Sequence, residues 1–261
     1  MGITPWETVK LARMPVRPTS LDYIERIFDG FMEMHGDRYY GEDRAIVGGI
    51  ALLGDTPVTV IAQQKGRNTK ENITRNFSMP HPEGYRKALR LMKQAEKFGR
   101  PIICFIDTPG AFCGLGAEER GQGEAIAENL AQMMLLKTPI LSVVISEGGS
   151  GGALALGVAD KVYMLEHSIY AILSPEGFAS ILYKDSSKAE QAAKDMKLTA
   201  QDLYRYQVID GIIPEPQGGA HNDYAQMADS IRSVLEAELA QLRGMKLEEL
   251  LENRYQKFRR I

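Results

Sequence analysis

The sequence predicts an α/β domain built on a largely parallel sheet. Two short runs, Ile102–Ile106 and Ile140–Ile145, are predominantly apolar, which is typical of strands buried on both faces. Each run is followed by a glycine-containing segment and then by a stretch with helical spacing of apolar residues. Strands that alternate with helices of this size indicate parallel βαβ units. We therefore expect ligand sites at the carboxyl ends of these strands.

Length and composition exclude several other classes of protein. The chain has 261 residues, of which 44% are hydrophobic and 25% are charged, and its formal net charge is -3. These values exclude a disordered, collagenous or coiled-coil chain and argue against a nucleic-acid groove. Cys104 and Cys113 are too few for a disulfide framework or a four-cysteine zinc site. No signal peptide or membrane segment is recognisable, so a reduced, cytoplasmic protein is expected.

The first half of the chain is expected to form a helix, a hairpin and a second helix. Ser20 is placed to cap the first helix, whose apolar positions continue at helical spacing to Phe31. The β-rich runs Ala45–Leu53 and Val58–Gln63 are separated by a Gly-Asp-Thr-Pro turn and predict a hairpin. Between residues 83 and 98, apolar side chains recur on one face of a helix.

The second half continues the alternation and then becomes mainly helical. Helices are expected at 118–136 and Ala153–Val158, and short strands at Val162–Leu165, Tyr170–Leu173 and Val208–Ile213. A long last helix carries an apolar stripe that could face either its own core or another subunit, and a charged tail follows it. The stripe consists of Met227, Ile231, Val234, Leu235, Leu239 and Leu242.

No low-complexity linker interrupts the chain, so a single domain over residues 1–261 is expected. It would comprise a helical lead-in at 1–40, a core at 45–185 and a mainly helical part at 186–261.

The strongest local signal for chemistry is the segment 146–153, Ser-Glu-Gly-Gly-Ser-Gly-Gly-Ala, between a buried strand and a helix. Successive glycines leave N–H groups bare at a helix N-terminus, where the partial positive charge favours an anion or a polarised carbonyl. The segment therefore has the outline of an oxyanion hole. A tight turn that only brings a helix close to the sheet is the alternative, although four glycines exceed what a turn requires.

A serine hydrolase is the rival enzyme class. The segment 148–152 matches G-x-S-x-G in the context of a nucleophile elbow, with Ser150 as the nucleophile. Such an enzyme needs a histidine base after the serine, and His167 and His221 are the candidates. His167 leaves little room for an acidic residue in between, and His221 lies in a polar loop.

Other reactive side chains are open to ordinary structural explanations. Asp107 could be a metal ligand or a base, or could simply hydrogen-bond the turn that follows it. Cys113 lacks a neighbouring base or cation that would make it a nucleophile. A basic stretch could bind phosphate or carboxylate groups or form a solvated surface. This stretch contains Lys65, Arg67, Lys70 and Arg75.

Nine segments, in order and spread over nearly the whole chain, resemble the carboxyltransferase alpha subunit of bacterial multi-subunit acetyl-CoA carboxylase. They are Ala45–Ile50, Gln64–Arg67, Arg75–Phe77, Pro82–Leu91, Asp107–Ala111, Gly116–Gly121, Glu147–Ala155, Ser174–Gly177 and Ile213–His221. Many members of this family begin with a further helical stretch ahead of the segment that matches Leu11–Arg13. This chain is expected to lack the assembly contacts of that stretch.

The resemblance implies a fold and a reaction. The fold would be a crotonase-like α/β spiral of ββα units with helical N- and C-terminal extensions. The reaction would move a carboxyl group from carboxybiotin, borne by a separate carrier protein, to acetyl-CoA, giving malonyl-CoA for fatty acid synthesis. Because the biotin ureido anion can itself take the proton from acetyl-CoA, such an enzyme needs preorganised N–H groups rather than a catalytic histidine.

The resemblance also implies site residues and partners. The amides of Gly151 and Gly152 would hold the ureido oxygen, and Ser150 would be a spacer. Nearby residues would shape or line the site: Gly148, Gly149, Ala153, Gly110, Ala111, Lys65 and Arg67. A beta subunit with a zinc ribbon would supply most of the acetyl-CoA side, in an assembly of two alpha and two beta chains. No metal is expected in this chain, and a chain that only scaffolds or binds an acyl-CoA is the third alternative.

Overall fold

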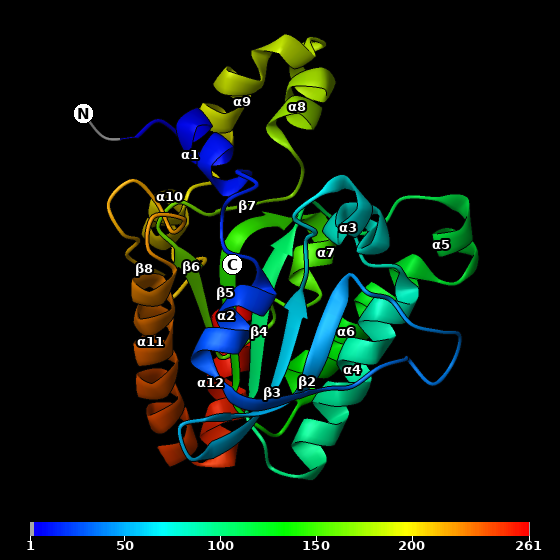
Figure 1. Ribbon diagram of the computed structural model, residues 1–261, viewed down its shortest axis with the longest axis vertical. Coiled ribbons are helices and arrows are strands. Elements are labelled where there is room, and N and C mark those ends of the chain that lie inside the picture. Colours follow the sequence, from blue (N-terminus) through cyan, green and yellow to red (C-terminus); the bar gives the residue numbers. More distant parts are fainter. Residues whose placement is uncertain (1–2, 261) are drawn as a thin grey trace.

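An eight-stranded sheet lies at the centre of the computed structural model, which describes residues 3–260 (Figure 1). The strand order is β1-β2-β3-β4-β5-β6-β8, and β7 pairs with the end of β5. The β1–β2 and β2–β3 pairs are antiparallel and the others are parallel. The strands are β1 (Asp29–Glu33), β2 (Ile46–Leu53), β3 (Thr56–Gln63), β4 (Ile102–Thr108), β5 (Ile140–Gly149), β6 (Lys161–Leu165), β7 (Ile169–Ala171) and β8 (Gly211–Ile213).

Helices cover both faces of the sheet (Figure 1). The α-helices are α1 (Pro5–Ala12), α2 (Ser20–Ile27), α3 (Thr69–Thr74), α4 (Pro82–Lys97), α5 (Leu115–Glu119), α6 (Gln122–Leu135), α7 (Ser150–Leu154), α8 (Pro175–Phe178), α9 (Ala189–Met196), α10 (Ala200–Arg205), α11 (Tyr224–Gly244) and α12 (Leu247–Arg259). Short helical turns occur at Asn76–Ser78, Ala179–Tyr183 and Ser186–Lys188. Within residues 3–260, no helix is both long enough and apolar enough to cross a membrane.

Two hydrophobic cores form because successive side chains of a strand point to opposite faces of the sheet. In β4, Ile103 and Phe105 pack with α2 and α11 on one face. Ile102, Cys104 and Ile106 pack with α4 and α6 on the other. The predicted α/β architecture with a largely parallel sheet is confirmed, and so are the hairpin and the two buried strands.

The apolar stripe of α11 serves the chain's own core. Met227, Ile231, Leu235, Leu239 and Leu242 are buried against α2 and the sheet. Of the two alternatives for this stripe, the structure supports the internal one.

The prediction for the N-terminal helix was wrong at both ends. Thr19, not Ser20, is the N-cap residue of α2 and forms a capping box with Asp22. The Ser20 hydroxyl instead donates to the Gln63 carbonyl at 2.6 Å. The helix ends at Ile27 and the chain continues as β1, in which Gly30 has a left-handed φ of 60°. The helical spacing of apolar residues that continues to Phe31 therefore runs past the end of α2 and into β1.

Other boundaries also differ. The helix predicted at 118–136 is two helices, because Gly121 between them has a left-handed φ of 82°. Strand β5 runs four residues beyond its predicted end at Ile145, and α7 begins three residues before the predicted Ala153. The predicted strand at Val208–Ile213 is only β8, Gly211–Ile213. The charged segment that was predicted as a tail after the last helix forms a further helix, α12.

Candidate active site

The carboxyl ends of β4 and β5 bring the two glycine-containing segments together. Gly148 and Gly149 do not lie in a loop. They are the last two residues of β5 and pair with β7. Helix α7 begins at Ser150, so Gly151 and Gly152 occupy its first turn, where N–H groups have no acceptor within the helix. No side-chain hydrogen bond caps this helix in the described part of the chain. The amides of Gly151 and Gly152 are thus available to an outside acceptor.

Gly152 lies against the segment that follows β4. A Cβ atom on Gly152 would stand 2.5 Å from the Ala111 amide nitrogen and 2.7 Å from the Gly110 carbonyl carbon. A Cβ on Gly149 would stand 2.1 Å from the Pro109 carbonyl oxygen. Only glycine permits this approach of two backbones. Gly110, Ala111, Gly149 and Gly152, all predicted site residues, are therefore neighbours.

The Ala111 N–H group has no acceptor in the described residues, and hydrogen bonds of both neighbouring residues fix its position. Gly110 N donates to Thr108 Oγ1 at 3.1 Å, and Phe112 N donates to the Pro80 carbonyl at 3.0 Å. Between them, Ala111 N donates to no protein acceptor among residues 3–260. Such a fixed, unpartnered N–H beside the first turn of a helix is the element from which oxyanion holes are built.

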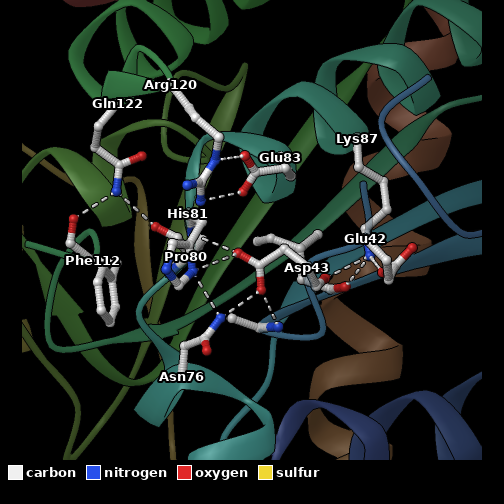
Figure 2. A network of polar contacts seen from close by, with 12 residues as sticks. Glu42, Asp43, Asn76, Pro80, His81, Glu83, Lys87, Phe112, Arg120 and Gln122 are labelled. Carbon is white, nitrogen blue, oxygen red and sulfur yellow. Dashed lines mark hydrogen bonds and ion pairs between the residues drawn. The ribbon is translucent and has the colours of Figure 1, made fainter. Parts of the chain in front are cut away.

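A network of polar contacts holds the neighbouring residue Phe112 in place, as Figure 2 shows. The Gln122 side-chain amide donates to the carbonyls of Pro80 and Phe112, at 2.9 and 2.8 Å. The His81 ring stacks on the Phe112 ring, with centroids 4.0 Å apart.

The remaining members of the network are ion pairs and one buried cation (Figure 2). The Glu83 carboxylate is paired with Arg120, and the buried Lys87 is bound to Glu42 and to the Asp43 carbonyl. These residues come from the loop before β2, from α4 and from the segment just before α6, and no local pattern in the sequence indicates a network between them.

The turn Asn76–Ser78 has an unusual backbone. All three residues have left-handed φ values, 49°, 54° and 60°. This conformation costs about 1–2 kcal/mol for each residue with a side chain. Neighbours enforce it: the Ser78 hydroxyl donates to the Asp107 carbonyl, the Thr108 hydroxyl donates to the Ser78 carbonyl, and Asn76 Nδ2 donates to Asp43 Oδ1 at 3.0 Å.

Lys65 and Arg67 line a cavity of about 430 Å³. Asp107, Glu147 and Phe77 also line it. The Lys65 ammonium is paired with Asp107, and Arg67 is paired with Asp22. Burial raises the pKa of the Asp107 carboxyl, against the opposing effect of the Lys65 ammonium. Asp107, which the sequence left open as a metal ligand, a base or a turn residue, is a buried member of an ion pair.

Gln63 connects this cavity with the glycine segments. Its Nε2 donates to the Gly152 carbonyl at 2.7 Å, and its Oε1 accepts from Asp107 N at 3.1 Å. The Asp107 carboxylate in turn accepts from Glu147 N at 3.3 Å. The buried Gln63 side chain at the end of β3 therefore joins the end of β4 to the first turn of α7, and this role was not predicted.

The segment after α1 closes one side of the cavity. Arg13 is paired with Glu147 and Glu176, at 2.7 and 2.8 Å. Arg17 is buried and donates to the Ile145 carbonyl at 2.9 Å and to Glu215. Burial alone would raise the pKa of Glu215, but hydrogen bonds from His167 and Arg17 outweigh it and lower the pKa to about 2.

Glu215→Gln is expected to destabilise the protein at neutral pH by about 3 kcal/mol, the equivalent of a fall in pKa from 4.5 to about 2. A carboxyl whose pKa is lowered in the folded state stabilises that state above its unfolded pKa. The difference between wild type and variant should therefore be constant above about pH 5 and shrink as the pH falls toward 2. Urea unfolding at several pH values measures it. A difference that does not change with pH would contradict the assigned cause.

Neither candidate histidine acts as a base for Ser150 in residues 3–260. The His167 ring is hydrogen bonded to Glu215, with Nδ1 3.0 Å from Oε2, and neither His167 nor His221 is bonded to Ser150 in the described residues. Ser150 is exposed and has a left-handed φ of 54°, as a nucleophile elbow requires. The backbone turn of a nucleophile elbow is therefore present at Ser150, but a histidine base is not bonded to it in the described residues.

Ala153 and the two cysteines have ordinary structural environments. The Ala153 side chain is buried in the core between the sheet and α4. Cys113 is exposed and Cys104 is buried in β4, and both are free. Among residues 3–260, no group of three or more histidine, cysteine, aspartate or glutamate side chains is placed to hold a metal ion.

The fold is that of crotonase-like carboxyltransferases. Transcarboxylase 12S superposes with a TM-score of 0.68 at 20% identity, over 88% of this chain and 44% of that chain. This chain thus spans less than half of the transcarboxylase chain. A chain of a Pseudomonas malonate decarboxylase hetero-tetramer superposes with a TM-score of 0.72 at 16% identity, over 90% of this chain and 91% of that chain. The predicted crotonase-like spiral is confirmed.

Sequence comparison is more specific. The model of the family "Acetyl co-enzyme A carboxylase carboxyltransferase-like" matches residues 1–261. A protein of Clostridium perfringens (strain SM101 / Type A), named acetyl-coenzyme A carboxylase carboxyl transferase subunit alpha, is 64% identical over 99% of this chain and 96% of its own. A protein of the same name from Halalkalibacterium halodurans is 61% identical over 100% of this chain and 80% of its own. The chain therefore belongs to the family of acetyl-CoA carboxylase carboxyltransferase alpha subunits.

Proposed function

We propose that this chain is the alpha half of a carboxyltransferase that moves a carboxyl group from carboxybiotin to acetyl-CoA and so forms malonyl-CoA. Biotin would be borne by a separate carrier protein. A beta subunit with a zinc ribbon would complete the site, in an assembly of two alpha and two beta chains acting in the cytoplasm. The family to which the chain belongs supports the reaction, and the free amides at the ends of β4 and β5 support the site.

The observation that carries the proposal is the contact between the backbones of Ala111 and Gly152. Their backbones are in close contact, and their N–H groups have no acceptor among residues 3–260. An oxygen held between them, with Gly151 beside it, would be stabilised as negative charge develops on it. Because neighbouring hydrogen bonds fix the Ala111 segment in advance, little reorganisation is needed when that charge forms.

The residues fit a biotin ureido group, which presents one carbonyl oxygen and needs hydrogen-bond donors for it. Carboxybiotin would supply both the transferred carboxyl group and, once that group has left, the base for acetyl-CoA. This chain would hold the ureido oxygen at Gly151, Gly152 and Ala111. Gly110 and Gly149 would permit the close approach of backbones, with Gly148 and Ala153 shaping the strand and helix that carry the amides. Lys65 and Arg67 would line the approach.

The proposal is tested by mixing the chain with the beta subunit. We expect co-purification and malonyl-CoA-dependent carboxylation of free biotin, the reverse reaction, only in the mixture. Full activity of the isolated chain would contradict a divided site. Absence of activity in a stable complex would contradict the proposed reaction.

A serine hydrolase remains the second candidate, because Ser150 is exposed with an elbow-like φ. Within the described part of the chain no histidine is bonded to Ser150. We therefore expect Ser150→Ala to change carboxyltransferase activity by no more than about 2-fold, whereas removal of a nucleophile typically costs about 10⁴-fold or more. A steady-state assay of the complex measures this. Labelling of Ser150 by a fluorophosphonate, or loss of activity with the fold intact, would instead favour the hydrolase.

A further inference from the structure

Phe77 is an aromatic side chain on the wall of the cavity that contains Lys65 and Arg67. The cavity measures about 430 Å³. Phe77 is 49% exposed, so much of the ring faces solvent and contributes little burial to the fold. Its position at the wall therefore has no explanation in core packing.

The backbone holds this ring in place against its own preference. Asn76, Phe77 and Ser78 all have left-handed φ values, which residues with side chains rarely adopt. Hydrogen bonds from Ser78 to Asp107 and from Thr108 to Ser78 enforce the turn. Enforced backbone strain of this kind is concentrated at ligand sites.

The same hydrogen bonds connect the turn that carries Phe77 to the segment that precedes Ala111. Thr108, which binds the Ser78 carbonyl, also binds the Gly110 carbonyl at 2.7 Å and accepts from Gly110 N. The turn that presents Phe77 and the segment that presents Ala111 thus share one anchoring side chain. Asp107, which precedes Thr108 in β4, lines the cavity together with Phe77, and Gln63 joins Asp107 to the Gly152 carbonyl.

We propose that Phe77 is a binding residue for the ureido ring of biotin, packing against the face of that ring while the amides of Ala111 and Gly152 hold its oxygen. A planar ring with a polar edge matches an aromatic wall beside hydrogen-bond donors and cations. The inference rests on the proposed carboxyl transfer and adds a contact to it.

The test uses the complex of this chain with the beta subunit and the malonyl-CoA-dependent carboxylation of free biotin. Phe77→Ala and Phe77→Gly are each expected to raise KM for biotin about 10-fold, the effect of losing one aromatic stacking contact. The KM for malonyl-CoA should not change, and Phe77→Tyr should behave as wild type. Phe77→Gly should also melt about 2–4 °C above Phe77→Ala, because glycine relieves the left-handed φ.

Phe98→Ala is the matched control, since Phe98 is likewise exposed, at 60%, but follows the C-terminal end of α4. It should leave both KM values unchanged. An unchanged KM for biotin in Phe77→Ala, or a rise confined to malonyl-CoA, would overturn the inference while the active wild-type complex upholds the proposed function. An inactive wild-type complex would instead contradict the proposed function and the inference with it.

Discussion

Gly152→Ala is expected to lower kcat of the assembled carboxyltransferase by about 100- to 1,000-fold, the loss that follows removal of one oxyanion donor. The new Cβ would stand 2.5 Å from the Ala111 nitrogen, well inside van der Waals contact, so the Ala111 segment must move by about an ångström. Misplacement of this size is enough to uncouple aligned groups. Steady-state kinetics of biotin carboxylation by the complex measure the loss.

Gly151→Ala is the matched control for this variant. A Cβ on Gly151 would meet only the Ile126 side chain, at an ordinary 3.6 Å, and the Gly151 N–H would remain. We expect near wild-type kcat and an unchanged melting temperature. Equal activity of the two variants would show that the contact between Ala111 and Gly152 does not matter for the reaction.

Arg254→Met is expected to give the largest loss of stability, roughly 4 kcal/mol, because it leaves a buried carboxylate without its partner. The Arg254 guanidinium is fully buried, with Nε 2.7 Å from Asp160 Oδ1. It also donates to the carbonyls of Met133, Leu136 and Thr138, at 2.8 to 2.9 Å. The melting temperature should fall by roughly 10 °C, as thermal unfolding followed by circular dichroism would measure.

Tyr255→Ala, the neighbouring substitution on α12, is the control. Tyr255 is 48% exposed, so its loss should change the melting temperature by no more than about 2 °C. A similar decrease for both variants would mean that α12 is stabilised by its helical content rather than by the Arg254 pair.

The sequence was sufficient to predict the largely parallel sheet and the location of the candidate site at the carboxyl ends of its strands. The runs Ile102–Ile106 and Ile140–Ile145 are predominantly apolar, as strands buried on both faces require. The glycines that follow these runs mark the close contact of Gly149 and Gly152 with the 109–111 segment. The periodicity of α4 and α11 was equally clear, because each has one buried face.

What could not be predicted depends on distant partners. Arg254 lies in a segment rich in charge. Its five hydrogen bonds, to the end of α6, to the loop before β5 and to Asp160, make it a core residue. The left-handed turn at Phe77 contains no glycine, so its backbone carries no local signal. Gln63 ends a β-rich run like any polar residue, yet it joins Asp107 to Gly152.

A crystal structure of the complex of this chain, its beta subunit and biotin tests the central claim most directly. We expect the ureido oxygen to lie within about 2.7–3.1 Å of the amide nitrogens of Ala111 and Gly152. A ureido oxygen bound elsewhere, with these two N–H groups satisfied by protein acceptors, would contradict it.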